Sequence, residues 1–232
     1  MDGNGRWAKE RHMPRLEGHR RGAEVVRMLI DKAPAYGLSH ITFYVFSSEN
    51  WNRPEEEVNG LMDLLRRVFT SELPKLKSKN IKIKTLGDKS TSTKLPEDVV
   101  NLLTRMENET ADNTGLHINF AINYGGRDEI LRACQCFVDD VEAGRRWVGD
   151  LDERLFSQYL DTDLQPDPDL IVRTGGDMRV SNFMLWQIAY AELCFLEKYW
   201  PDFTEEDLKE LLNEYTGVER RFGGLPNLSS IS

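Results

Sequence analysis

The sequence contains no apolar run long enough to cross a membrane. Its longest uncharged apolar stretches, residues 41–48 and 181–191, are far shorter than the ~20 residues that a transmembrane helix needs. Charged residues interrupt the N-terminus from Arg6 onward, so no apolar core of a secretory signal peptide can form there. We therefore expect neither a transmembrane helix nor a signal peptide.

Cysteine is scarce and basic charge is in deficit. There are three cysteines, an odd count, and they lack metal-ligand spacing: Cys134, Cys136 and Cys194. This is typical of reduced thiols in a cytosolic protein. Lys and Arg number 30 against 39 Asp and Glu, and the formal net charge of −9 argues against a protein that coats nucleic acid. The absence of a GxxxxGK motif followed by Ser or Thr excludes a P-loop nucleotide hydrolase. We therefore expect no nucleic-acid partner.

The 232 residues alternate short apolar runs with longer stretches of helical periodicity, which is the pattern of a parallel α/β sheet. Helices are predicted over residues 17–36, from 54 onward, and over 95–108, 127–143 and 204–215. Strands are predicted over residues 41–46, 81–86, 117–122, 170–172 and 193–196. In the helix over 127–143, the side chains expected to face the core are Ile130, Leu131, Cys134 and Val138. The sequence thus predicts a single α/β domain with a central, mostly parallel sheet flanked by helices.

Four loops are unusually rich in glycine, asparagine and arginine. One opens the chain and the others follow predicted strands, where parallel sheets bind ligands; they span residues 2–7, 47–53, 123–127 and 173–182. Glycine-rich backbone can direct several N–H groups at an anion, and guanidinium groups suit phosphate oxygens. In an otherwise acidic chain, the arginines in or near these loops are Arg6, Arg15, Arg53, Arg173 and Arg179. The residues alone therefore predict two diphosphate sites.

Two carboxylates and one histidine complete this prediction. Asp2 and Glu192 are candidate oxygen ligands for Mg²⁺, which usually bridges carboxylate to substrate phosphates. His19 lies one helical turn beyond Arg15 on the same face, which favours a phosphate contact. Trp7 and Trp51 are expected to pack locally against their loops. Any one loop is more often structural than catalytic, and a nucleotide-binding regulator is the alternative that the residues leave open.

Five motifs in order give a more specific indication: MDGNGRWA, RLEGH, YVFSSENWNRP, NYGGR and RTGGDMRVSNFMLWQIAYAEL. Together they resemble the cis-prenyltransferase family, and the similarity runs from Met1 to about Gly224. The resemblance implies a homodimer whose parallel sheet and helices surround an apolar channel, with residues 1–224 as the catalytic domain and 225–232 as a mobile tail. It also implies that isopentenyl diphosphate is condensed onto an allylic diphosphate, usually farnesyl diphosphate, with each new double bond cis. The expected product is a long-chain polyprenyl diphosphate such as undecaprenyl diphosphate, the carrier lipid of cell-wall synthesis.

The resemblance assigns a role to each motif residue. Asp2 is expected to assist departure of the allylic diphosphate through Mg²⁺, Glu192 to be a second magnesium ligand, and Asn50 to help remove the proton from isopentenyl diphosphate. The residues expected to hold the allylic diphosphate are Gly3, Asn4, Gly5, Arg6, Trp7, Arg15 and His19. The substrate-binding residues expected beside Asn50 are Ser47, Ser48, Glu49, Trp51 and Arg53. Those expected to hold isopentenyl diphosphate are Arg173, Arg179, Val180 and Ser181, with Arg221 and Gly223 reaching the partner subunit's molecule.

Two features depart from the family's pattern. Many relatives carry Glu-His where this chain has Asp177-Met178, so a contact made by that His is expected to be missing or replaced. The family also places an apolar strand before Asp2, and this sequence lacks it, so Asp2 is expected to lie on a frayed end. The alternatives are a short- or medium-chain synthase and a non-catalytic partner subunit. Such partners typically lose the aspartate and arginine that stand here as Asp2 and Arg6, which argues against the second alternative.

An apolar product needs a dry channel. The candidate lining is an apolar helical stripe, and the alternative is that this stripe simply packs in the core. Its residues are Val58, Leu61, Met62, Leu65 and Phe69. Val45 and Leu116 are expected to narrow this channel. The resemblance further implies a cytoplasmic enzyme that contacts the membrane surface when it releases its product.

Overall fold

The computed structural model describes residues 1–90 and 93–216, so Arg221, Gly223 and the expected tail over 225–232 lie outside the described residues. Its α-helices are α1 (Asn4–Glu10), α2 (Arg15–Lys32), α3 (Glu55–Ser78), α4 (Glu97–Glu109), α5 (Gly126–Glu142), α6 (Glu153–Ser157) and α7 (Glu205–Thr216). Its strands are β1 (His40–Ser47), β2 (Lys82–Leu86), β3 (His117–Tyr124), β4 (Leu170–Arg173) and β5 (Glu192–Phe195). Every predicted helix and strand is therefore present, and α1 and α6 are additional.

All strand pairs of the described residues are parallel, as the sequence predicts, and these strands form two sheets. One sheet has the order β1-β3-β2 and the other pairs β4 with β5. Central strands of parallel sheets are buried on both faces, and β3 is buried at every residue from 118 to 124. The carboxyl ends of β1 and β3 lie side by side, with Ser47 paired to Tyr124, so their two loops meet.

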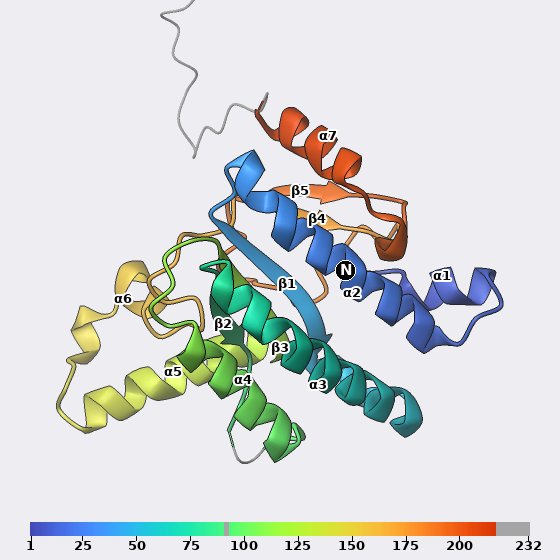
Figure 1. Cartoon of the computed structure of the whole chain (residues 1–232). Coiled ribbons are helices and arrows are strands. Elements are labelled where there is room, and N and C mark those ends of the chain that lie inside the picture. The colour runs from blue at the N-terminus through green and yellow to red at the C-terminus, as the bar shows by residue number, and fades with distance from the viewer. Residues whose placement is uncertain (91–92, 217–232) are drawn as a thin grey trace, which may run out of the picture.

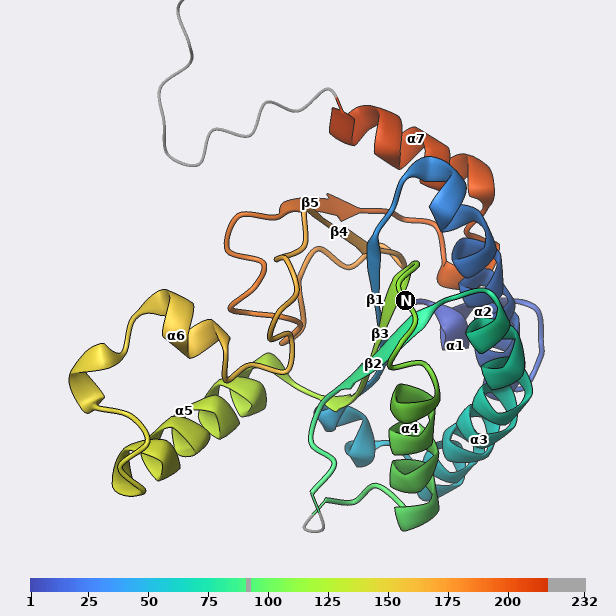
Figure 2. The same ribbon diagram turned by 60° about the vertical axis from the view of Figure 1, so that its left-hand side comes forward.

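Helices cover the three-stranded sheet on both sides. Figure 1 and Figure 2 show α2, α3 and α4 along one face, with α5 and α6 on the opposite side and α7 beside α2. The main core lies between the sheet and the α2–α4 layer, where Phe43 stacks with Phe120, and Phe69 packs against Phe120. No helix of the described residues is long and apolar enough to cross a lipid bilayer.

The prediction for the buried face of α5 is wrong for three of four residues. Ala133 and Phe137 face the core, whereas Leu131 and Val138 are 64% and 50% exposed and Cys134 is exposed. Ile130 packs partly buried, as predicted. The helix carries two apolar stripes, and the side of the sheet on which α5 lies decides which stripe is buried.

The amino ends of β1 and β3 bring His40 beside His117, with ring centroids 4.5 Å apart. Burial lowers the pKa of both imidazoles below 6.5. The charge of His117 lowers the pKa of His40 further, and the charge of Lys82 does the same for His117. The unfolded chain therefore binds more protons than the folded chain as pH falls below 6.5, and folding stability declines in that direction.

We expect His40→Asn to flatten this decline. The melting temperature should fall less between pH 7.5 and pH 5.5 in the variant than in the wild type, because one of two clustered imidazoles no longer takes up a proton on unfolding. His12→Asn is the matched control, since His12 is exposed and has a positive φ of 55° that asparagine tolerates. Equal pH slopes in the wild type and both variants would contradict the prediction.

Candidate functional site

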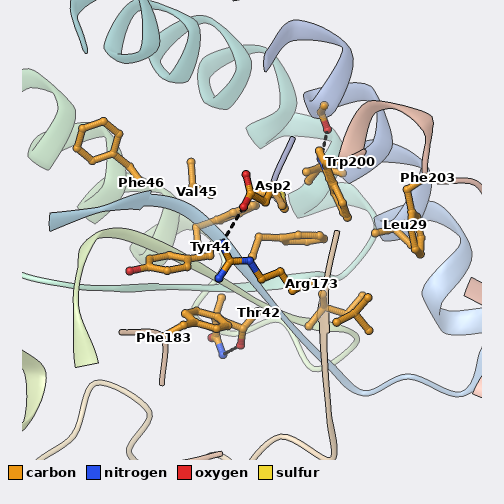
Figure 3. A pocket seen from close by; sticks show the side chains of 18 of the residues that line it. Asp2, Leu29, Thr42, Tyr44, Val45, Phe46, Arg173, Phe183, Trp200 and Phe203 are labelled. Carbon is orange, nitrogen blue, oxygen red and sulfur yellow. Dashed lines mark hydrogen bonds and ion pairs between the residues drawn. The ribbon is translucent and has the colours of Figure 1, made fainter. Parts of the chain in front are cut away.

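A cavity of about 1100 Å³ lies between β1 and β4 and extends along α2 and α3. Figure 3 shows Asp2 and Arg173 facing each other in its middle, with Tyr44 and Phe183 on one side and Leu29, Trp200 and Phe203 on the other. The cavity thus joins a charged region at the carboxyl end of β4 to an apolar interior.

Asp2 is held firmly, so the expectation of a frayed end is wrong. Its backbone N–H donates to Thr174 Oγ1 at 3.0 Å, and its carbonyl accepts from Thr174 Oγ1 at 2.8 Å. The same carbonyl accepts from the Trp200 N–H at 2.9 Å. These contacts join the first residues to the loop after β4 and to the 3-10 helix η4 (Trp200–Asp202). They involve the Asp2 backbone, so they do not depend on its carboxylate.

The Asp2 carboxylate lies between two arginines. Its Oδ2 is 2.8 Å from Arg173 Nη2, and its Oδ1 is 3.4 Å from Arg6 Nη2. Burial opposes ionisation of Asp2, and hydrogen bonds from Arg173 and from the Gly3 N–H outweigh it, so the pKa of Asp2 lies below its ordinary value. A carboxylate and two guanidinium groups thus face one another at the cavity.

α1 and α2 meet at glycines, and this contact positions two more of the predicted residues. A Cβ at Gly18 would lie 1.9 Å from the Asn4 carbonyl oxygen, so only glycine permits this approach. A Cβ at Gly5 would lie 2.7 Å from Arg15 Cζ, which places the Arg15 guanidinium directly against α1. Asn4 directs its Oδ1 toward Gly22, where it has no hydrogen-bond partner among the described residues.

His19 lies within a cluster of charges on α2 and α3. Arg15 Nε and Arg53 Nη1 are 3.2 and 3.1 Å from the two carboxylate oxygens of Glu57. Burial lowers the pKa of His19 to about 4, with the charge of Arg53 adding to this effect, so the imidazole is neutral at pH 7. Its Nε2 is buried and has no hydrogen-bond partner in the described part of the chain. A buried polar atom of this kind requires a partner, and a bound ligand can supply it.

The loop after β1 is fixed by its own side chains. Asn50 Oδ1 accepts from the Ser47 N–H at 3.1 Å, and the Ser47 side chain accepts from the Asn50 N–H in return. Glu49 Oε1 accepts from Asn182 Nδ2 at 2.8 Å, which ties this loop to the one after β4. Ser47, Glu49, Asn50 and Arg53 all line the cavity. The Asn50 amide NH₂ remains as a donor.

The loop after β4 gathers the other predicted anion ligands. Arg173 Nη1 donates to Ser181 Oγ at 2.7 Å and to the carbonyl of Arg179. Arg173, Arg179, Val180 and Ser181 line the cavity. The loop turns at Gly175, whose φ of 93° is a left-handed conformation that favours glycine.

Four predicted residues of the described chain are not brought to the cavity. Trp7 Nε1 donates to Asp202 Oδ1 and Trp51 Nε1 to Asn123 Oδ1, both at 2.7 Å, so these indoles pack their loops. Ser48 donates to Glu49 and lies off the lining. Glu192 begins β5 opposite Leu170, three residues before the level of Arg173 and so ~10 Å along the strand. Within one chain, Glu192 therefore lies away from Asp2, the other candidate magnesium ligand.

The apolar lining agrees in part with the predicted stripe. Leu61, Met62, Leu65 and Phe69 on α3 line the cavity, whereas Val58 is buried in the core and does not. Val45 on β1 also lines it. Leu116 is 6% exposed and packs in the core away from the lining, so the expectation that it narrows the channel is wrong.

The sequence analysis did not predict two features of the site. Thr174 anchors the Asp2 backbone across 172 residues, a pairing that no local pattern indicates. Tyr44 and Phe183 stack with ring centroids 4.5 Å apart at the cavity wall, one on β1 and the other beyond the loop after β4. Phe183 follows the SN pair of the quoted motif directly, so proximity to Ser181 is the one clue that could have indicated it.

The carboxylate that lines the cavity, Asp2, fits Mg²⁺ only when a substrate supplies further ligands. The described residues contain no group of three or more His, Cys, Asp or Glu side chains that could hold a metal by themselves. Asp2 lines the cavity with a side chain 37% exposed, beside arginines that attract anions. One or two carboxylates plus substrate phosphates are the usual Mg²⁺ ligands, so Asp2 fits an ion that arrives with a phosphate-bearing substrate.

Comparisons with known proteins show what the chain is similar to. A family model described as "Putative undecaprenyl diphosphate synthase" matches residues 1–223. An isoprenyl transferase of Clostridium perfringens is 43% identical over 225 residues, covering 97% of this chain and 88% of that protein. The crystal structure of lavandulyl diphosphate synthase from Lavandula x intermedia, in complex with dimethylallyl diphosphate, is 35% identical with a TM-score of 0.91, covering 96% of this chain and 95% of that one.

A second solved structure, a probable undecaprenyl diphosphate synthase from Campylobacter jejuni, is 34% identical with a TM-score of 0.77. The match covers 88% of this chain and 92% of that chain. The match of the family model over nearly the whole length, the identity to isoprenyl transferases and the shared fold lead to one conclusion. The chain belongs to the cis-prenyltransferase family and is an enzyme of prenyl chain elongation.

Proposed function

We propose that the protein condenses isopentenyl diphosphate repeatedly onto farnesyl diphosphate, in a Mg²⁺-dependent reaction, and releases undecaprenyl diphosphate. The observation that carries this proposal is the position of Asp2, between Arg6 and Arg173, where a charged region opens into an apolar cavity of about 1100 Å³. A diphosphate fits the charged region, and a growing hydrocarbon chain fits the apolar one.

The two substrates are assigned to two sides of Asp2. The allylic diphosphate is assigned to the region around Gly3, Arg6, Arg15 and His19, which line the cavity together. The isopentenyl diphosphate lies against Arg173, Arg179 and Ser181, with Arg221 and Gly223 assigned to the partner subunit's molecule.

Ionisation of the allylic diphosphate places negative charge on the departing group. Arg6 and Arg15 stabilise that charge because their guanidinium groups are fixed before the reaction, by Asp2 and Glu57 respectively. Neutral His19 offers Nε2, which is buried and unpartnered in the described residues, as a hydrogen-bonding group to a phosphate oxygen. Mg²⁺, when bound at Asp2 with the diphosphate, supplies Lewis-acid stabilisation of the same charge.

The proton of isopentenyl diphosphate leaves after the new carbon–carbon bond has formed. A neutral amide is a poor base, and Asn50 Oδ1 already accepts from the Ser47 N–H, which leaves its NH₂ to donate. We therefore assign to Asn50 the orientation of a diphosphate oxygen, and that oxygen takes the proton.

Product analysis tests the proposal. Labelled isopentenyl diphosphate with farnesyl diphosphate and Mg²⁺ should give a ladder ending at the C55 product on thin-layer chromatography. Excess EDTA should abolish the ladder, and added Mg²⁺ should restore it. A ladder ending well short of C55 would support a short- or medium-chain synthase, and undiminished activity in EDTA would contradict the Mg²⁺ requirement.

Val45→Phe should shorten the product by one or more isoprene units, because the larger ring fills cavity volume that the chain would otherwise occupy. Val58→Phe is the matched control: Val58 is 7% exposed in the core and off the lining, so overpacking should cost ~1–3 kcal/mol of stability without shortening the product. An unchanged ladder from an active Val45→Phe enzyme would remove Val45 from the channel.

The family resemblance also leads us to propose a homodimer that works in the cytoplasm and touches the membrane when product leaves. The apolar residues that α5 exposes, Leu131 and Val138, support a protein–protein contact on that face. Sedimentation of the wild type against Leu131→Asp tests the dimer, and a wild-type monomer at micromolar concentration would contradict it.

A further inference from the structure

Asp177 lies in the middle of three guanidinium groups. Its Oδ2 is 3.0 Å from Arg179 Nη2 and 3.5 Å from both Arg6 Nη2 and Arg173 Nη2. The Asp177 side chain is 28% exposed, and none of the roles assigned above includes it. One carboxylate thus contacts arginines from both proposed diphosphate subsites.

Asp177 is not required to hold two of these arginines in place. Arg173 is fixed by Asp2 at 2.8 Å and by Ser181 Oγ at 2.7 Å, and its side chain is 15% exposed. Arg6 is held by Asp2 and lies over the ring of Tyr199, with Cζ 5.5 Å from the centroid. For Arg6 and Arg173, Asp177 therefore adds negative charge but is not needed to fix the position of the guanidinium group.

The charges balance closely without a ligand. Two carboxylates, Asp2 and Asp177, face Arg6, Arg173 and Arg179, which leaves one net positive charge. A diphosphate brought to these arginines adds several negative charges next to Asp177, and like charges in close contact repel. The arginines can bind the diphosphate fully only when Asp177 has left them.

The surroundings of Asp177 leave room for such a movement. Gly175 and Gly176 have φ values of 93° and 79°, and a Cβ at Gly176 would meet nothing nearer than 3.9 Å. Gly176 is exposed, so the segment carrying Asp177 has open space beside it. The N–H groups of Gly175 and Gly176 donate to the carbonyls of Lys198 and Leu196, both at 2.9 Å, so the backbone of these glycines stays in place and the Asp177 side chain makes the movement.

We propose that Asp177 is an internal counter-ion, which occupies the arginines of the isopentenyl diphosphate subsite when that subsite is empty and is displaced by the incoming diphosphate. This inference rests on the proposed function, which assigns Arg173 and Arg179 to that substrate. Asp177 thereby sets the affinity for the anion, because binding competes with an existing ion pair.

Asp177→Asn tests the displacement, since asparagine keeps the size of the side chain and removes its charge. Inorganic diphosphate, titrated calorimetrically without Mg²⁺, should bind the variant about tenfold more tightly, the factor expected if the unpaired arginines make up about a tenth of the wild-type population. The KM for isopentenyl diphosphate should fall with it, and more than the KM for farnesyl diphosphate, because Asp177 contacts two arginines of the first subsite and one of the second.

Two further variants make the result decisive. Asp177→Glu should restore wild-type affinity, and Asp202→Asn is the matched control because Asp202 pairs with Arg11 outside the cavity and should leave the affinity unchanged. Equal or weaker diphosphate binding by Asp177→Asn would overturn the inference. A wild-type protein that binds no inorganic diphosphate would instead overturn the assignment of the arginines, so the two failures are distinguishable.

Discussion

Asp2→Ala is expected to lower turnover about a thousandfold, corresponding to ~4 kcal/mol of transition-state stabilisation. The variant loses the carboxylate that fits Mg²⁺ beside the allylic diphosphate, and it loses the ion pairs with Arg6 and Arg173. Its fold should survive because Thr174 and Trp200 hold the Asp2 backbone, not its side chain. Steady-state kinetics at saturating Mg²⁺ and a thermal melt measure both effects.

The isosteric variant separates charge from shape. Asp2→Asn keeps an acceptor for the Gly3 N–H and should be nearly as inactive as Asp2→Ala, because a neutral amide is a poor Mg²⁺ ligand. Asp202→Ala removes an exposed carboxylate that pairs with Arg11 outside the cavity, and its turnover should stay within a few-fold of the wild type. Wild-type-like turnover by either Asp2 variant would show that Asp2 is not part of the reaction.

Local patterns in the sequence predicted the strands and most helix limits well. β1 contains a continuous β-branched and aromatic run over residues 41–46, and Gly37 ends the predicted 17–36 segment with a φ of 73°. Thr204 and Asp207 form a capping box at the start of the predicted 204–215 helix, with the Thr204 N–H donating to Asp207 Oδ2 at 2.7 Å. Each of these features depends on neighbouring residues alone.

Features that depend on distant contacts were not predictable in this way. The firm placement of Asp2 requires Thr174 and Trp200, and no periodicity links residues that far apart. The position of Glu192 depends on where β5 begins relative to β4, which local composition does not determine. The buried stripe of α5 depends on the neighbours of Phe137, because both of its stripes are apolar.

Arg173→Ala should raise the KM for isopentenyl diphosphate about 30- to 100-fold, because charge-assisted hydrogen bonds to a diphosphate contribute about 2–3 kcal/mol. The KM for the allylic substrate should change much less, since Arg6 on α1 and Arg15 against α1 remain. Arg15→Ala should give the reverse pattern. These opposite responses follow from the separation of the two loops, with Arg15 at the start of α2 and Arg173 at the end of β4.

A control and a rescue sharpen this test. Arg11→Ala also removes an arginine that pairs with a carboxylate, Asp202, but outside the cavity, so both KM values should stay near those of the wild type. Arg173→Lys restores the charge without the guanidinium fork that reaches Asp2 and Ser181 together, and should recover only part of the affinity. Equal increases in both KM values with Arg173→Ala would mean that Arg173 serves both diphosphates, and the division of the site at Asp2 would have to be abandoned.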